Sequence, residues 1–354
     1  MTGEKLRLVY VGSFTPDAGG KGEGISILAQ DPTTGALAPH GPTARVTDPA
    51  FLAWHPDGSH LYAVNESAGT VTGLAVDAAG ALTVGASQPT GGDGPCHVTV
   101  HPRGGYVLCA NYGSGSISVH PILDGGEVGP RSDLVQHAGS GPDPDRQEGP
   151  HAHNVQLDLA GRRVLVIDLG TDEVRSYDLD LETGELETGP VARPAPGTGP
   201  RHAAFHPGGW VFVADELAST VSTYSYTTRT GALGLLGSIP ATAATTAESV
   251  RNYPSEIELS ADGRFLYVAN RGADCITAFE VADDGTLRVI ADVPSGGTWP
   301  RHFALIEPFL YVANQNSDTV ATFRINAKTG VPEPTGAVLD VPSPACILPA
   351  RPTP

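Results

Sequence analysis

One pattern constrains the fold of this chain more than any other: short apolar stretches recur along its whole length, and each ends on a small polar residue. These residues, which we call the polar column, are Ser13, Asn65, Asn111, Asp168, Asp215, Asn270 and Asn314. Successive positions lie 44 to 57 residues apart, a period typical of a four-stranded propeller blade. Between them, Gly-bearing turns separate further short strands, which indicates an antiparallel meander. We therefore predict an all-β fold: a seven-bladed β-propeller with four antiparallel strands per blade, forming one domain over residues 1–354.

The two ends of the repeat each leave a strand without a partner. The first apolar strand, near residues 7–12, has no strand before it, and the last, near residues 344–349, has none after it. An unclosed ring would expose the backbone donors and acceptors of both edges. We therefore predict that these two strands pair and that the termini together close the ring.

A second repeated position lies two residues after a proline. It carries Phe51, His97, His153, His202, Glu256, His302 and Cys346, with the His153 segment GPHAH one residue longer than the others. Because the first strand of a propeller blade is innermost, we expect this position to face one mouth of the central channel. The residues that follow the polar column should face the same mouth; they are Phe14, Glu66, Tyr112, Leu169, Glu216, Arg271 and Gln315. The Gly/Pro-rich connection over residues 137–150 is expected to overhang the mouth as a lid or wall.

The predicted mouth combines groups that exchange protons with groups that bind anions. It gathers His97, His153, His202, His302, Glu216, Glu256, Arg146, Arg201, Arg271 and Arg301. Histidine titrates near neutral pH, and the arginine fork suits a carboxylate, a phosphate or a developing oxyanion. This favours a functional site, although such groups can also simply satisfy one another around a wet channel. His55, His101 and His206 fall in turns at the opposite end, where we expect a structural role.

Charge and motifs narrow the class of partner. The formal net charge of −18 argues against nucleic acid or an anionic membrane and favours a small-molecule ligand. An anionic ligand would then need a local cationic patch. The sequence has no G-x-S-x-G nucleophile motif and no nucleotide-binding loop, so we expect no cofactor. We also expect no metal, because arginines lie among the histidines and glutamates. The oligomeric state stays open.

The cysteines point to a reducing compartment. Cys96, Cys109, Cys275 and Cys346 form neither a CxxC pair nor a disulfide framework, so we expect buried free thiols. We recognise no signal peptide and no stretch long enough to span a bilayer. A cytoplasmic location is therefore the expectation.

Four stretches resemble a known family: GSGPDPDRQEGPHAHNVQLD, GPRHAAFHPGG, VADELASTV and SEIELSADGRFLYVANRG. They are similar to the seven-bladed lactonases, which include bacterial propeller-type 6-phosphogluconolactonases and fungal carboxy-muconate cyclases. The resemblance implies His153, Arg201, Glu216 and Arg271 as catalytic residues, and it implies no metal. We expect His97, His202, Glu256, His302, Arg301 and Arg146 to contact the substrate.

The chemistry implied by this resemblance is the opening or closing of a lactone ring. Hydrolysis needs a base for water, a cation for the tetrahedral oxyanion and an acid for the leaving oxygen. Glu216 or His153 could be the base, and Arg201 and Arg271 could hold the oxyanion or an anionic group of the substrate. The leading hypothesis is a hydrolase of an anionic sugar lactone such as 6-phosphogluconolactone. The alternatives are a cycloisomerase of a carboxymuconate-type diacid and a non-catalytic propeller that binds a metabolite.

Overall fold

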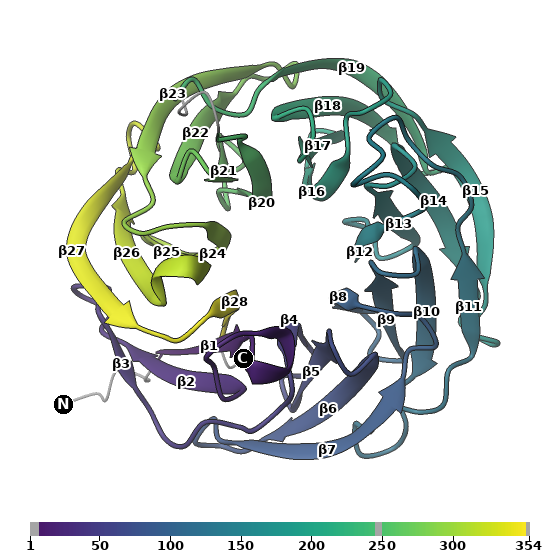
Figure 1. Ribbon diagram of the computed structural model, residues 1–354, viewed down its shortest axis with the longest axis horizontal. Helices are drawn as coiled ribbons and strands as arrows, with labels where there is room; N and C mark the ends of the chain where they lie inside the picture. The colour runs from purple at the N-terminus through teal and green to yellow at the C-terminus, as the bar shows by residue number, and fades with distance from the viewer. Residues whose placement is uncertain (1–6, 245–249, 352–354) are drawn as a thin grey trace.

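The computed structural model describes residues 7–244 and 250–351, and it confirms the predicted fold. Seven antiparallel sheets of four strands form blades around a central axis (Figure 1). The strands are β1 (Arg7–Ser13), β2 (Ile25–Gln30), β3 (Leu37–Pro39), β4 (Pro49–Trp54), β5 (His60–Asn65), β6 (Thr70–Val76), β7 (Leu82–Pro89), β8 (Pro95–Val100), β9 (Tyr106–Asn111), β10 (Ser116–Pro121), β11 (Asp133–Gln136), β12 (Ala152–Leu157), β13 (Arg163–Asp168), β14 (Glu173–Leu179), β15 (Leu186–Ala192), β16 (Pro200–His206), β17 (Trp210–Asp215), β18 (Thr220–Thr227), β19 (Ala232–Pro240), β20 (Tyr253–Leu259), β21 (Phe265–Arg271), β22 (Cys275–Val281), β23 (Leu287–Pro294), β24 (Pro300–Ile306), β25 (Phe309–Asn314), β26 (Thr319–Ile325), β27 (Pro332–Asp340) and β28 (Pro344–Pro349).

Helical structure is limited to short turns in the described chain. Two 3-10 helices, η1 (Pro16–Ala18) and η2 (Gln315–Ser317), each span three residues. Across residues 7–244 and 250–351, no helix has the length and apolar character needed to cross a membrane.

The blades are numbered here from the N-terminus. Blade 1 has the strand order β28-β1-β2-β3, and blades 2 to 7 use four consecutive strands each, from β4–β7 to β24–β27. In Figure 1 the first strand of a blade, such as β8, β16 or β24, lies nearest the centre, and the fourth lies on the rim. The entries of the first strands and the ends of the second strands therefore meet at one mouth.

The predicted closure of the ring by both ends of the chain is confirmed. The purple strand β1 and the yellow strand β28 share blade 1 (Figure 1). Their antiparallel register pairs Val9 with Pro349 and Gly12 with Cys346. The N–H of Ala350 extends the ladder by donating to the carbonyl of Leu8 at 2.8 Å. Blade 1 is thus complete only when β28 is in place.

Neighbouring blades are joined by a repeated tyrosine contact as well as by apolar packing. A tyrosine on the second strand donates its hydroxyl to a glycine carbonyl of the next blade. The pairs Tyr10–Gly80, Tyr267–Gly330 and Tyr311–Gly35 are each 2.8 Å apart. Each glycine has a positive φ, so a residue that tolerates the left-handed region is needed there.

The turn histidines make an equivalent contact between blades. Their Nε2 atoms hydrogen-bond glycine carbonyls of the following blade, in the pairs His55–Gly104 at 3.3 Å, His101–Gly161 at 3.2 Å and His206–Gly263 at 3.1 Å. This geometry supports the structural role expected for the three histidines.

The polar column ties the second strand of a blade to the third. The Nδ2 atom of Asn65 donates to Oγ1 of Thr72 at 2.6 Å, and the hydroxyl of Ser222 donates to Oδ2 of Asp215 at 2.6 Å. These side chains are buried, so the bonds satisfy polar groups that would otherwise be costly. The polar column therefore fixes the strand ends next to the mouth, and its own side chains do not line the mouth.

Candidate active site

A β-bulge at the entry of the first strand decides which side chains face the mouth. In blade 5, Pro200 pairs with Asp215 and His202 pairs with Ala214, which leaves Arg201 between them without a partner in the ladder. Blade 7 repeats this arrangement with Arg301 as the bulged residue. A bulge turns its extra side chain away from the alternation of the strand. The bulged residue and the residue after it therefore form two separate columns.

This register corrects the predicted position of His153. In blade 4, Ala152 pairs with Asp168 and Asn154 pairs with Ile167, so His153 is the bulged residue. His153 corresponds to Arg201, and Asn154 takes the position that His202 holds in blade 5. The repeat position predicted for His153 was wrong because Ala152, and not Pro150, occupies the place that the proline holds in the other blades. A shift of one residue moves a side chain to the other column.

The inner column packs into a ring of aromatic and imidazole side chains. Ring centroids are 4.0 Å apart for Phe51 and His97, 5.3 Å for His97 and His202, and 5.3 Å for Phe51 and His302. Burial, with nearby positive charge, lowers the pKa of His202 and the other histidines of this ring, so they are neutral at physiological pH. These predicted substrate-binding residues thus form the floor beneath the mouth.

A largely buried carboxylate links two of the floor histidines. Oε2 of Glu256 lies 3.0 Å from Nδ1 of His202 and 3.1 Å from Nε2 of His302. The N–H of Ile347 donates to Nδ1 of His302 at 3.3 Å, so the proton of this imidazole is on Nε2, the nitrogen near Glu256. Burial raises the pKa of Glu256. Across the described ranges, no group of three or more His, Cys, Asp or Glu side chains is arranged to hold a metal ion.

Three arginines converge on the carboxylate of Glu216. Nη2 of Arg146 lies 2.5 Å from Oε1, Nη2 of Arg271 lies 2.6 Å from Oε2, and Nε of Arg201 lies 3.1 Å from Oε2. Burial alone would raise the pKa of Glu216, but Arg271, Arg201 and Arg146 outweigh it and hold the pKa at about 2. Glu216 is therefore ionised at any physiological pH.

Arg201 is the least satisfied of these arginines. It is only 2% exposed. Its contact with Glu216 lacks the alignment of a hydrogen bond, and its Nε and Nη1 atoms find no acceptor within residues 7–244 and 250–351. Burial and the charge of Arg271 lower its pKa to about 9, so it still carries its charge at neutral pH. A buried guanidinium that lacks acceptors is costly, and an anionic ligand would supply them.

The predicted wall is present, and it brings Arg146 to the mouth. His137, at the start of the connection, bonds Oδ2 of Asp168 through Nδ1 at 2.5 Å, and both side chains are buried. Gln147, at its far end, is wholly buried as well. Arg146 lies between these anchors, which is why its Nη2 atom reaches Glu216.

Two mouth residues were not among the predicted site residues. Nη2 of Arg146 donates to the hydroxyl of Tyr112 at 3.3 Å, and the Tyr112 ring lies edge-on to His153 with centroids 5.4 Å apart. Glu66 lies 3.7 Å from Nη2 of Arg301. Both could have been found, since they directly follow the polar column as Glu216 does.

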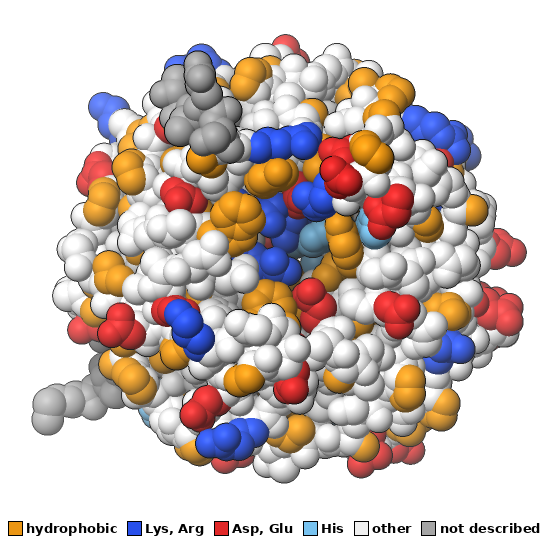
Figure 2. Space-filling model, in the orientation of Figure 1, with side chains coloured by type: hydrophobic (Ala, Val, Ile, Leu, Met, Phe, Trp, Pro, Cys, Tyr) orange, Lys and Arg blue, Asp and Glu red, His pale blue; other side chains and the backbone are white. Residues whose placement is uncertain are grey.

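The mouth is a cationic hollow on an acidic protein. Figure 2 shows basic side chains in the Lys/Arg colour and histidines in the central depression, with acidic side chains at its edge and scattered over the surrounding face. The depression contains the buried arginines described above. The arrangement can bind an anion and stabilise a developing oxyanion, and it places imidazole and carboxyl groups beside that position.

Comparisons with known proteins agree with this geometry. A family model described as lactonase, 7-bladed beta-propeller, matches residues 8–349. The 6-phosphogluconolactonase of Bacillus subtilis is 32% identical over 345 residues, which cover 96% of this chain and 97% of that protein. A 6-phosphogluconolactonase of Formosa agariphila is 30% identical over 91% of this chain and 93% of its own. The structure of a periplasmic gluconolactonase of Pseudomonas aeruginosa superposes with a TM-score of 0.90 at 29% identity, over 98% of this chain and 99% of that chain.

Proposed function

The chain belongs to the seven-bladed β-propeller lactonases and is a lactonase, and on this premise we propose that its substrate is an anionic sugar lactone such as 6-phosphogluconolactone. The reaction is hydrolytic opening of the lactone ring. The observation that supports an anionic substrate is the surplus of guanidinium groups at the mouth, above all the unsatisfied Arg201. The chain as a whole has a net charge of −18, so this positive charge is confined to the mouth.

Arg201 and Arg271 are proposed to receive negative charge. Hydrolysis turns the planar lactone carbonyl into a tetrahedral oxyanion, which is stabilised by donors already in place. Arg201 has free N–H groups for this purpose. Arg271 is fixed by Glu216 and by the carbonyl of Tyr253, to which its Nε donates at 3.1 Å. Both guanidinium groups therefore need little reorganisation when charge develops.

Glu216 is proposed to hold the arginines and not to act as the base. A carboxylate with a pKa of about 2, ion-paired with three guanidinium groups, has little tendency to accept a proton from water. Its role is to keep like-charged side chains close together. For Glu216 this corresponds to the alternative considered for the whole group, in which the polar side chains satisfy one another.

His153 is proposed to hydrogen-bond the substrate as a neutral imidazole. Burial and the charge of Arg201 hold its pKa well below the ordinary value. Nδ1 lies 3.8 Å from Sγ of Cys96, which leaves Nε2 for the substrate. The floor residues His97, His202, Glu256 and His302 would shape the pocket below it.

Turnover measurements with three classes of compound test the proposal. We expect 6-phosphogluconolactone to be hydrolysed with a higher kcat/KM than neutral glucono-δ-lactone, and the difference to shrink as salt screens the arginines. A chelator should leave the rate unchanged. A preference for the neutral lactone would contradict an anionic substrate. Conversion of a carboxymuconate without lactone opening would favour the cycloisomerase, and saturable binding without turnover would favour a non-catalytic propeller.

We also propose a cytoplasmic location. It is supported by the four free cysteines, all of which are buried, since unpaired thiols persist in reducing compartments. One relative is named a periplasmic enzyme, so fractionation of the native host is the deciding measurement. Recovery in the periplasm would contradict this location.

A further inference from the structure

Glu66 occupies the mouth position of blade 2 and is held there by its backbone. It directly follows β5, and its N–H donates to the carbonyl of Asp48 at 3.0 Å. Glu216 is anchored in the same way in blade 5, where its N–H donates to the carbonyl of Gly199 at 2.7 Å. Asp48 and Gly199 both have a positive φ. The same local geometry therefore presents both glutamates to the mouth.

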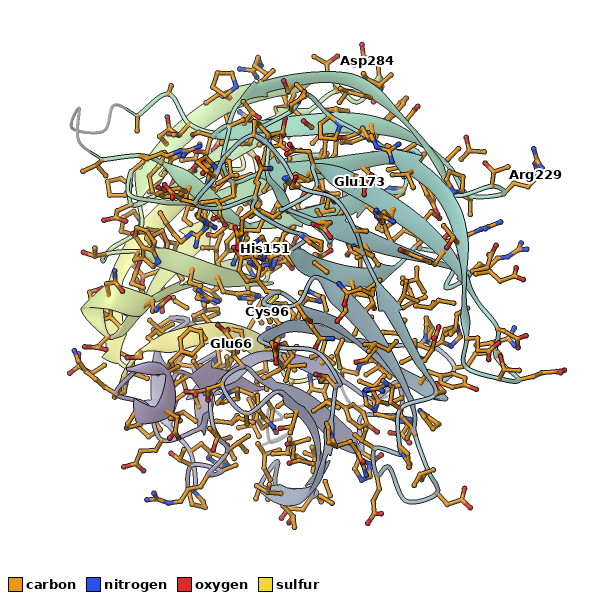
Figure 3. All side chains as sticks on the ribbon, turned by 45° about the vertical axis from the view of Figure 1, so that its right-hand side comes forward. Glu66, Cys96, His151, Glu173, Arg229 and Asp284 are labelled. Atoms are coloured by element: carbon orange, nitrogen blue, oxygen red, sulfur yellow. The ribbon has the colours of Figure 1, made fainter. Side chains whose placement is uncertain are left out.

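The side chain of Glu66 is partly exposed, and its carboxyl group has few partners. Its side chain is 33% exposed, against 3% for Glu216. Within residues 7–244 and 250–351 its one ion-pair contact is with Nη2 of Arg301 at 3.7 Å, which is too long for a hydrogen bond. Oε2 finds no hydrogen-bond partner in the described chain. Figure 3 places Glu66 and Cys96 toward the centre of the ring, whereas Arg229 and Asp284 lie at its periphery.

The charges around Glu66 come from several elements. Arg301 on β24 and Arg201 on β16 favour its ionised form, while Asp48, just before β4, opposes it. Cys96 on β8 is a protonated thiol at neutral pH, since burial raises its pKa to about 12. Burial is the largest influence on Glu66 and raises its pKa above the ordinary value. Glu66 can therefore exchange a proton at a pH where Glu216 cannot.

We propose that Glu66 is the proton-transfer residue of this lactonase, acting first as general base and then as general acid; the inference rests on the hydrolytic function proposed above. Glu66 takes a proton from water as the water oxygen bonds to the lactone carbonyl carbon. The carbonyl electron pair moves to oxygen, where Arg201 receives the charge. When the tetrahedral intermediate collapses, the bond to the ring oxygen breaks, and that oxygen takes the proton from Glu66. The product is the open hydroxy acid, and Glu66 is ionised again.

The proposal predicts a specific pH dependence. The base must be ionised, so kcat should fall as pH falls through the pKa of Glu66. Arg301 favours the ionised form; replacing it with glutamine should move this acidic limb to higher pH. A glutamate that only neutralises Arg301 would not control the limb.

The decisive experiment compares pH profiles of kcat with 6-phosphogluconolactone for wild type, Glu66→Gln, Arg301→Gln and Glu280→Gln. Glu280 is exposed and pairs with Arg288 on an outer part of blade 6, so its variant controls for loss of one negative charge. We expect Glu66→Gln to lower kcat about 100-fold or more and to abolish the acidic limb. Glu280→Gln should leave both unchanged.

The outcomes separate this inference from the proposed function. If wild type opens the lactone and Glu66→Gln keeps both its kcat and its acidic limb, the assignment of Glu66 is wrong and the lactonase function stands. If wild type opens no anionic lactone, the proposed substrate class is wrong, and the assignment of Glu66 that rests on it is withdrawn as well. Circular dichroism and the melting temperature of Glu66→Gln check that the fold is intact. A folded variant with only a raised KM would also overturn the catalytic role.

Discussion

Glu66 in blade 2 and Glu216 in blade 5 share one repeat position but differ in their surroundings. Each follows the polar column and donates its N–H to the residue before the first strand. Glu216 forms ion pairs with three arginines, and its pKa is held at about 2. In the part of the chain that the structure describes, Glu66 has one ion-pair contact, with Arg301 at 3.7 Å, and burial raises its pKa.

The difference shows that the repeat sets the position of a side chain, whereas residues of other blades set its pKa. Arg146 reaches Glu216 from the connection before blade 4, and Arg271 reaches it from blade 6. Among the described residues, only Arg301 lies within ion-pair distance of Glu66, at 3.7 Å. A single ring position can thus serve as an anchor for cations in one blade and as a proton carrier in another.

The largest expected effect is on the stability of Glu216→Gln. Removing the carboxylate leaves three arginines without their shared counter-charge. Breaking a buried ion pair in this way costs about 3–5 kcal/mol. Urea unfolding should show this loss for Glu216→Gln and little change for Glu66→Gln. Equal losses of unfolding free energy in the two variants would contradict the different roles assigned to Glu216 and Glu66.

A slightly smaller effect is expected in the kinetics of Arg201→Ala. If Arg201 stabilises the oxyanion, the variant should lose about 2–4 kcal/mol of transition-state stabilisation, seen as a lower kcat. If it binds only the ground state, KM should rise with kcat unchanged. Steady-state rates with 6-phosphogluconolactone distinguish the two cases. If Arg201→Ala has the kinetics of the wild type, Arg201 has no role in binding or catalysis.

The pH dependence of stability should have opposite signs at the two glutamates. Glu216 has a lowered pKa in the folded state, so its contribution is present above the ordinary pKa of 4.5 and is lost as pH falls toward about 2. Glu66 has a raised pKa, so stability falls as pH rises from 4.5 through the folded-state value. Unfolding free energies of each Gln variant, subtracted from wild type between pH 3 and 7, should slope in opposite directions.

The smallest expected effect is that of Arg146→Ala. Its side chain is 33% exposed, so solvent screens its bond to Glu216. We expect a loss of about 0.5–1 kcal/mol in stability and a modest rise in KM, with the acidic limb of kcat unchanged. Movement of that limb would mean that Glu216, and not Glu66, controls it.

The fold could be predicted because its signals are local and repeated. The spacing of Asn65, Asn111 and Asp215 indicated the blades, and the unpaired strands at each end indicated the closure. The convergence of Arg146, Arg201 and Arg271 followed from the same repeat, together with the wall before Pro150. Each of these inferences needed only the order of strands.

The misplacement of His153 and the raised pKa of Glu66 have physical causes that a sequence does not display. The bulge at His153 is a property of pairing with β13, and one extra residue in the segment hides it. The protonation of Glu66 depends on burial and on Arg301, which lies far along the chain. Partners in distant blades are set by tertiary packing and not by the repeat itself.

The closing strand has a consequence for biosynthesis. β28 follows every other strand in chain order, yet it is the innermost strand of blade 1. Chains are synthesised at about 5–20 residues per second, so β28 is made roughly 15–60 s after β4 begins to emerge. Until then β1 has no partner on that edge. During this interval β1 presents an open edge to other nascent chains. A circular permutant that starts with β28 ahead of β1 should aggregate less during synthesis, measured as the soluble fraction after cell-free translation.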